Sequence, residues 1–196
     1  MPNLADYYAD LLSWEGQPPR VLVDPWPSAL RTSIENDLVQ AVSNAGLNGA
    51  HCPIKPGSTN QSVGNQVEAF TVDSLAPHPT AFCLTACRGA GYPDKMLREN
   101  ATGLIIPLEM KATSDWNPRD SNRRVLTSSS QKLRSQFGSP IHHLLATVLY
   151  SPVQGGVQVD HLRLDFLEPS TTVSVRLEAS VNHKILATDG HHTRVI

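Results

Sequence analysis

The sequence lacks the features that mark membrane, secreted and disordered proteins. No apolar run of about 18 residues occurs, so no transmembrane helix is expected. The first residues, MPNLADYYADLLSW, contain neither the basic start nor the apolar stretch of a signal peptide, which predicts a cytoplasmic location. Charged residues make up only 17% of the chain and the net charge is −2. These values indicate neither a disordered chain nor a protein that coats nucleic acid non-specifically.

Cysteine is also scarce, and nucleotide-binding motifs are absent. The three cysteines cannot all pair, and Cys83 and Cys87 lie four residues apart on one expected strand, where a disulfide has poor geometry. We therefore expect Cys52, Cys83 and Cys87 to be buried small hydrophobic side chains. The sequence has no P-loop, no dinucleotide-binding glycine motif and no nucleophile elbow, so no nucleotide cofactor is expected.

The length of 196 residues fits a single domain, 1–196, with a helical N-terminal part over about 1–75 and a sheet core over about 80–180. Apolar residues at helical spacing predict helices over 3–14, 28–45 and 59–74, and a short fourth helix from the serines at 128–130 to about 137. Asn3 and Ser28 are expected to cap the first two helices, and Gly46 to close the second.

Short apolar or alternating runs predict the strands. They cover 81–88, 103–111, 144–151 and 157–167, with 171–178 expected to pair with 157–167. The run 144–151 is nearly all apolar, which is typical of a central strand. The pair His191-His192 near the C-terminus is expected to lie in a mobile tail. Helices followed by a sheet whose middle contains carboxylates predict a mixed α/β fold.

A group of charged residues surrounds the second of these strands. Pro93-Asp94 comes first, 14 residues separate Asp94 from Glu109, and Glu109-Met110-Lys111 ends the apolar strand. Residues two apart on a strand point to the same face, so Glu109 and Lys111 project together while Met110 points into the packing. If the chain turns back between 100 and 103, Asp94 lies beside Glu109.

Two neighbouring carboxylates repel each other unless a cation neutralises them. A hard divalent ion suits such oxygen ligands, lowers the pKa of bound water and polarises a phosphodiester. The ammonium of Lys111 would then stabilise charge on the phosphate, or orient and deprotonate the attacking water. The pattern therefore predicts a metal-dependent phosphodiesterase site formed by Asp94, Glu109 and Lys111.

The string PD-(14 residues)-EMK resembles the active-site motif of the PD-(D/E)XK nuclease superfamily, whose best-known members are type II restriction endonucleases. The resemblance implies a restriction-endonuclease-like central mixed sheet flanked by helices. It also implies that Asp94, Glu109, Lys111 and Glu68 are the catalytic residues, with Glu68 an auxiliary acid from an N-terminal helix. Mg²⁺ would be the cofactor, and the metal set comprises Asp94, Glu109, Glu68 and Met110.

A polar segment follows the motif directly. Between Lys111 and Arg134 six basic residues are opposed by only two acidic ones, although the chain as a whole is acidic. Arginine, asparagine and glutamine read base edges in the major groove, and lysine and hydroxyl groups contact phosphates. The candidate DNA-binding residues are Ser114, Asn117, Arg119, Asp120, Asn122, Arg123, Arg124, Ser128, Gln131, Lys132 and Arg134. A solvated loop without a ligand is the alternative interpretation.

Three functions are compatible with these patterns. The first is a type II restriction endonuclease that cleaves double-stranded DNA at a specific sequence, as a homodimer whose two-fold axis matches a palindromic site. The second is a structure-specific repair or junction-resolving nuclease of the same superfamily. The third is a DNA-binding module without catalysis, in which Asp94, Glu109 and Lys111 form a structural ion network.

Overall fold

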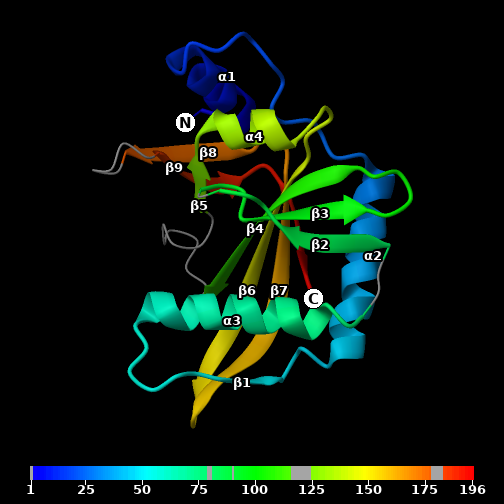
Figure 1. The fold of residues 1–196 in the computed structure, drawn as a ribbon, viewed down its shortest axis with the longest axis vertical. Helices are drawn as coiled ribbons and strands as arrows, with labels where there is room; N and C mark the ends of the chain where they lie inside the picture. Colours follow the sequence, from blue (N-terminus) through cyan, green and yellow to red (C-terminus); the bar gives the residue numbers. More distant parts are fainter. Residues whose placement is uncertain (1, 79–80, 90, 116–124, 178–182) are drawn as a thin grey trace.

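The computed structural model describes residues 2–78, 81–89, 91–115, 125–177 and 183–196. These residues form a mixed α/β fold with a curled mixed sheet flanked by helices (Figure 1). The described helices are α1 (Leu4–Trp14), α2 (Ser28–Ala45), α3 (Asn60–Leu75) and α4 (Ser130–Gln136). The described strands are β1 (His51–Pro53), β2 (Phe82–Ala86), β3 (Lys95–Glu99), β4 (Ile105–Thr113), β5 (Val125–Ser128), β6 (His143–Val153), β7 (Gly156–Leu167), β8 (Thr172–Leu177), β9 (His183–Asp189) and β10 (His192–Val195). None of the described helices is long and apolar enough to cross a membrane.

The predicted helices are all present, and their ends follow local chemistry. The Asn3 side chain caps α1 by accepting a hydrogen bond of 2.8 Å from the Asp6 N–H. Gly46 closes α2 in the left-handed conformation, with φ of 58°, as predicted. The predicted cap at Ser28 is wrong, because Pro27 occupies the N-cap position and no side chain caps the helix.

The main sheet has the strand order β1-β7-β6-β4-β3-β2, with β10 also paired to β7. Strand β6 lies between β7 and β4, which confirms the prediction that 144–151 is central. Strands β4 and β6 run parallel, and the other pairs are antiparallel. The predicted pairing of 171–178 with 157–167 is wrong, because β8 pairs with β9 in a second sheet, β5-β9-β8. Alternation of polar and apolar residues identifies a strand but not its partner.

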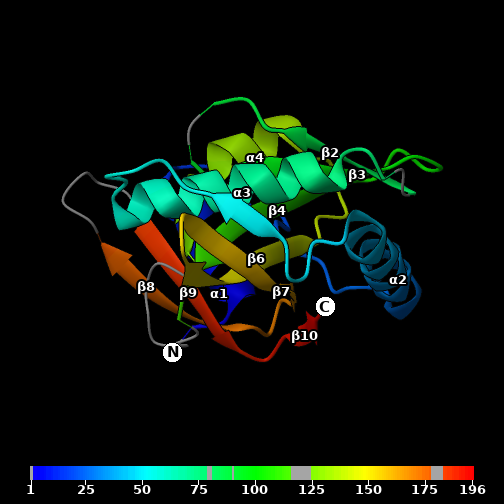
Figure 2. The same cartoon turned by 90° about the horizontal axis from the view of Figure 1, so that it is seen from below.

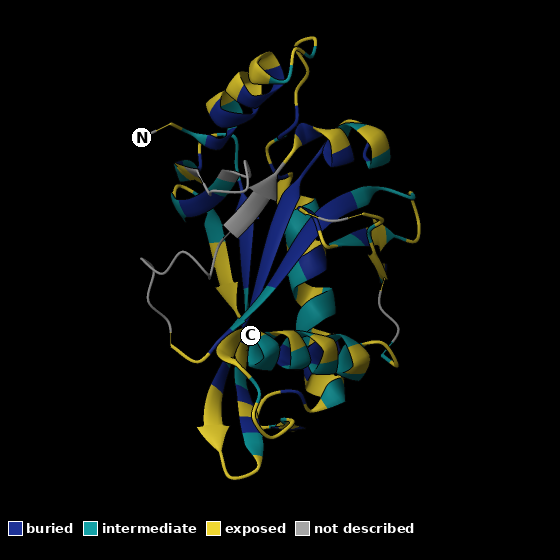
Figure 3. Ribbon diagram, turned by 60° about the vertical axis from the view of Figure 1, so that its left-hand side comes forward, coloured by how far each residue is buried: buried dark blue, intermediate teal, exposed yellow. Residues whose placement is uncertain are grey.

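The main sheet separates two hydrophobic cores. Helices α2 and α3 pack on one face, where Leu144, Ala146 and Val148 of β6 point. Helices α1 and α4 and the second sheet cover the other face, toward which Leu145 points. Figure 2 shows α2 and α3 on the sheet from below, and Figure 3 shows that the central strands are buried. Side-chain alternation along β6 thus divides its residues between the two cores.

The C-terminal segment is ordered, so the prediction of a mobile tail at His191-His192 is wrong. Residues 192–195 form β10 on β7. The buried Asp165 carboxylate fixes this strand: it accepts hydrogen bonds from the Arg163 Nε (2.9 Å), the Thr193 hydroxyl (2.6 Å) and the His191 Nε2 (3.2 Å). The pairing partner of a terminal segment depends on such long-range contacts, which local sequence does not reveal.

All three cysteines are free. Cys52 is buried as predicted, and Cys87 is partly buried. The expectation of burial is wrong for Cys83, which is exposed on β2. Strand β2 lies at the end of the main sheet, where β3 is its one neighbouring strand among the described residues.

Candidate active site

The end of strand pairing between β3 and β4 creates the candidate site. Strand β3 pairs with β4 from Arg98 opposite Ile105 to Lys95 opposite Leu108, and the pairing stops there. Strand β4 continues alongside β6 as far as Thr113. Asp94 precedes β3 and Glu109 follows Leu108, so the two carboxylates become neighbours at this point. The chain turns back before β4 as the sequence predicted.

Lys111 links the two carboxylates. Its Nζ lies 2.6 Å from Glu109 Oε1 and 3.9 Å from Asp94 Oδ2. The Asp94 N–H donates a further hydrogen bond of 3.2 Å to Glu109 Oε2. The Glu109 side chain is 2% exposed, whereas those of Lys111 and Asp94 are 26% and 44% exposed. The cluster thus has a buried carboxylate at its base and an accessible carboxylate and ammonium at its opening.

Glu68 reaches the same cluster from α3. Its carboxylate accepts a hydrogen bond from the Ala112 N–H, and the charges of Lys111 and Asp94 influence its pKa. Gly64, one turn earlier on α3, has the Ala112 carbonyl 3.7 Å from the position where a Cβ would stand. Helix α3 therefore passes close to the end of β4, which places Glu68 beside the cluster that Asp94, Glu109 and Lys111 form.

Burial and charge shift the proton affinities within the cluster. Burial raises the pKa of Glu109 to about 7, and the charge of Asp94 adds to the rise while Lys111 opposes it. Burial also raises the pKa of Glu68, against the opposing charges of Lys111 and Lys95. For Lys111, burial lowers the pKa, but the charge and hydrogen bond of Glu109 outweigh this effect and the pKa is raised. Lys111 is therefore an ammonium near neutral pH.

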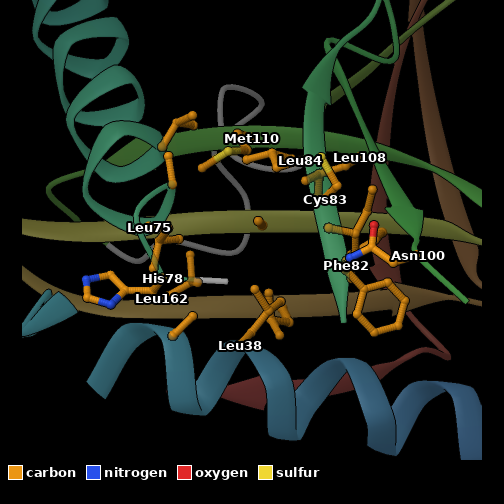
Figure 4. A pocket seen from close by; sticks show the side chains of 17 residues that line it. Leu38, Leu75, His78, Phe82, Cys83, Leu84, Asn100, Leu108, Met110 and Leu162 are labelled. Atoms are coloured by element: carbon orange, nitrogen blue, oxygen red, sulfur yellow. The ribbon is translucent and has the colours of Figure 1, made fainter. Parts of the chain in front are cut away.

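Met110 faces away from this cluster. Its side chain is buried and, with Leu108 and residues of α2 and α3, lines an apolar cavity of about 380 Å³ on the other face of the sheet (Figure 4). The Met110 thioether therefore cannot reach a metal held by Asp94 and Glu109. A ligand role for Met110 is limited to its main-chain carbonyl, a group that binds hard cations.

Helix α4 has a different role from the one its polar residues suggested. Lys132 is buried, and its ammonium donates hydrogen bonds of 2.9 and 2.7 Å to the carbonyls of Gly89 and Gly91. Arg134 donates to the Ser130 hydroxyl, 2.8 Å away. The predicted DNA contact by Lys132 is therefore corrected: these hydrogen bonds hold the loop that leads to Asp94.

The other candidate DNA-binding residues fall into three groups. Ser114 and Gln131 are exposed and available to a ligand. The structure describes only the backbone of Ser128, in β5. Six residues lie outside the described part of the chain: Asn117, Arg119, Asp120, Asn122, Arg123 and Arg124.

The oxygen ligands of the cluster fit a hard divalent cation. Among the described residues, no three His, Cys, Asp or Glu side chains lie close enough together to hold a metal, so the predicted set of Asp94, Glu109 and Glu68 does not form a three-carboxylate site. Mg²⁺, however, is usually bound by one or two carboxylates and takes its other ligands from water and substrate phosphates. Asp94 and Glu109 supply such a pair. The raised pKa of Glu109 indicates that the protein compensates its negative charge incompletely.

Sequence reasoning missed Lys95 as a member of the site. Its charge lowers the pKa of Glu68, so it adds a second cation beside the carboxylates. Its position directly after Pro93-Asp94 was the available signal, but the unpredicted strand β3 was needed to orient it.

Neither a protein-family model nor a curated protein matches the sequence of this chain.

Proposed function

We propose that the chain is a magnesium-dependent type II restriction endonuclease, which cleaves double-stranded DNA at a specific sequence by phosphodiester hydrolysis. The observation that carries the proposal is the convergence of Asp94, Glu109, Lys111 and Glu68 at the end of β4. Asp94 and Lys111 contact the buried Glu109 carboxylate, and Glu68 lies near enough for the charges of Lys111 and Asp94 to act on it. The sequence motif and the geometry support the same chemistry independently.

The electrostatics of the cluster argue against a purely structural ion network. Exposed ion pairs stabilise a protein little, and buried ones seldom repay the free-energy cost of desolvation. Here burial and the charge of Asp94 leave Glu109 with a pKa of about 7, so ionising it costs free energy. Perturbed carboxylates of this kind are concentrated at functional sites.

Each residue has a definite chemical capacity in this mechanism. The ammonium of Lys111 can bind a phosphate oxygen and stabilise the negative charge that develops during hydrolysis. Because its pKa is raised, Lys111 does not act as the base at neutral pH. The raised pKa of Glu109, about 7, applies without a cation, and a cation held by Glu109 would favour its charged form. Asp94 is exposed enough to contact the substrate side of the cluster.

Asp94 and Glu109 would hold Mg²⁺, with Glu68 as an auxiliary acid and the main-chain carbonyl of Met110 as a further oxygen. When bound, the ion would polarise the phosphodiester and lower the pKa of an attacking water. The mixed α/β class with a flanked sheet is what the proposal requires at the level of fold class. One motif makes one active site, so we propose a homodimer that cuts both strands.

Incubation of the purified protein with a mixed-sequence plasmid tests this function. With Mg²⁺, we expect discrete and reproducible fragments, and none when EDTA replaces the metal. Sequencing of the fragment ends would give the recognition sequence and the stagger. Cleavage confined to branched or nicked substrates would instead support a junction-resolving nuclease. DNA binding without any cleavage would contradict the proposal and support a non-catalytic module.

A further inference from the structure

A buried hydrogen-bond chain lies beneath the turn that carries Asp94. The hydroxyl of Tyr92, two residues before Asp94, is hydrogen-bonded to His143 Nδ1. His143 Nε2 lies 2.6 Å from the Leu22 carbonyl. Both Tyr92 and His143 are buried in the core that α1 and α4 cover. These two hydrogen bonds thus connect the turn that carries Asp94 to His143, the first residue of β6, and His143 to Leu22 in the segment after α1.

The partners fix the tautomer of His143. Burial lowers its pKa to about 4, so the ring is neutral near pH 7. Only an N–H can donate to the Leu22 carbonyl, which places the proton on Nε2. Nδ1 is then an acceptor, and the Tyr92 hydroxyl donates to it. Each of the two ring nitrogens is therefore matched to its partner.

Packing holds the same ring in place. His143 stacks between Tyr8 and Tyr92, with ring centroids 5.3 and 5.7 Å away. Along β6, His143 and Leu145 point to the same face, and Leu145 is the register partner of Glu109 on β4. One short stretch of β6 therefore contacts both halves of the carboxylate pair: the Glu109 strand through backbone pairing, and the Asp94 turn through His143.

We propose that His143 is a positioning residue for the active site, which acts through the Tyr92 hydroxyl to hold the Asp94 turn in register with Glu109. This inference rests on the proposed function, because it assumes that Asp94 and Glu109 bind the cation together. Partners that orient metal ligands from behind commonly change metal affinity by about 10- to 100-fold when they are lost. His143 touches neither the cation nor the substrate.

The variant Tyr92→Phe tests the inference because it removes one hydroxyl and keeps the stacked ring. Mn²⁺, which suits the same oxygen ligands, would be titrated into the full chain and its binding followed by electron paramagnetic resonance. We expect Mn²⁺ affinity about tenfold weaker than in the wild type. The KM for DNA should stay within about twofold, because the hydroxyl makes no contact with the substrate.

Tyr8→Phe is the matched control. Its ring also stacks on His143 and its hydroxyl is also buried, but this hydroxyl has no hydrogen-bond partner among the described residues. We expect Tyr8→Phe to keep wild-type Mn²⁺ affinity. The variant His143→Gln, whose amide offers both a donor and an acceptor, should retain more affinity than His143→Phe, which keeps only the ring. This second pair carries the test if Tyr92→Phe does not fold.

The outcomes separate this inference from the proposed function. Equal Mn²⁺ affinity in Tyr92→Phe and the wild type would overturn it, and so would equal losses in Tyr92→Phe and Tyr8→Phe. If the wild-type protein binds Mn²⁺ with the expected differences between variants but cuts no DNA, the positioning role stands and the endonuclease proposal fails. A wild-type protein that binds no Mn²⁺ overturns both.

Discussion

Glu109 on β4 and Asp165 on β7 are both buried carboxylates, yet the protein shifts their pKa values in opposite directions. Burial alone would raise the pKa of both carboxyls. For Asp165, the hydrogen bonds from His191, Arg163 and Thr193 outweigh burial, and its pKa is lowered to about 2. Glu109 shares one ammonium with Asp94 and receives one backbone N–H, and its pKa rises to about 7. Asp165 is thus surrounded by donors, whereas the charge of Glu109 is only partly compensated, as expected if Glu109 holds a cation in the proposed site.

The largest expected effect is on catalysis, and it is confined to the β4 cluster. Lys111→Ala should reduce the rate of DNA cleavage by about 1,000-fold, because it removes the charge that stabilises the transition state. Binding of DNA without metal should persist. Arg163→Ala, the matched removal of a cation from the Asp165 cluster, should leave the rate per folded molecule within about twofold. Normal cleavage by Lys111→Ala would show that the active-site assignment is wrong.

The next effect is on stability, and it is confined to the Asp165 cluster. Asp165→Ala leaves the Arg163 guanidinium in a partly buried position without its carboxylate, which should lower the free energy of unfolding by about 3 to 5 kcal/mol. Urea denaturation followed by circular dichroism measures this loss. Glu109→Gln at pH 8 should cost far less, because it removes a charge that is itself costly to bury. Equal losses in the two variants would remove the contrast between the carboxylates.

The two carboxylates should also give opposite pH dependences. Asp165 has a folded pKa below its ordinary value of 3.8. Its contribution to the free energy of unfolding is therefore complete above about pH 4 and is lost as the pH falls through about 2. Glu109 has a folded pKa above its ordinary value of 4.5. Its ionisation therefore lowers the free energy of unfolding as the pH rises from about 4.5 through 7.

Unfolding free energies of Glu109→Gln and the wild type, measured from pH 5 to 8, would reveal the Glu109 effect. The difference in unfolding free energy should move in favour of the variant by about 2 to 3 kcal/mol across this range. The Asp165 carboxyl itself should add no pH dependence to the difference between Asp165→Asn and the wild type from pH 5 to 8, because its folded pKa is about 2. A constant difference for Glu109→Gln would contradict the raised pKa.

The smallest expected effect is at Glu68, which approaches the cluster from α3 and is only partly buried. Glu68→Gln should lower the cleavage rate by about tenfold, as is typical for an auxiliary group rather than a primary ligand. Glu35→Gln is a control on α2, where the carboxylate contacts His192 instead of the β4 cluster. If Glu68→Gln reduced the cleavage rate as much as Lys111→Ala is expected to, Glu68 would be a primary catalytic group and not an auxiliary one.

Local patterns predicted much of this architecture. Helical spacing located α1, α2 and α3 within one residue, because the apolar face of each helix is written in its own sequence. The apolar run of β6 predicted its central place. Strand β3 escaped prediction because its residues, KMLRE, are mostly charged or flexible and gain their pairing from β2 and β4. The C-terminal strand β10 was also not predicted, because it depends on its pairing with β7 and on the hydrogen bonds of Asp165.

The sequence by itself determined the chemistry of the candidate site: two carboxylates, a lysine two residues from one of them, and a further acid on a predicted helix. Their residue types and spacing are local properties. Only the tertiary structure decided that Glu109 is buried and Asp94 is open, that Lys132 supports a loop, and that His143 lies behind the Asp94 turn. Burial and pairing depend on segments far apart in the chain, and these set the pKa of each group.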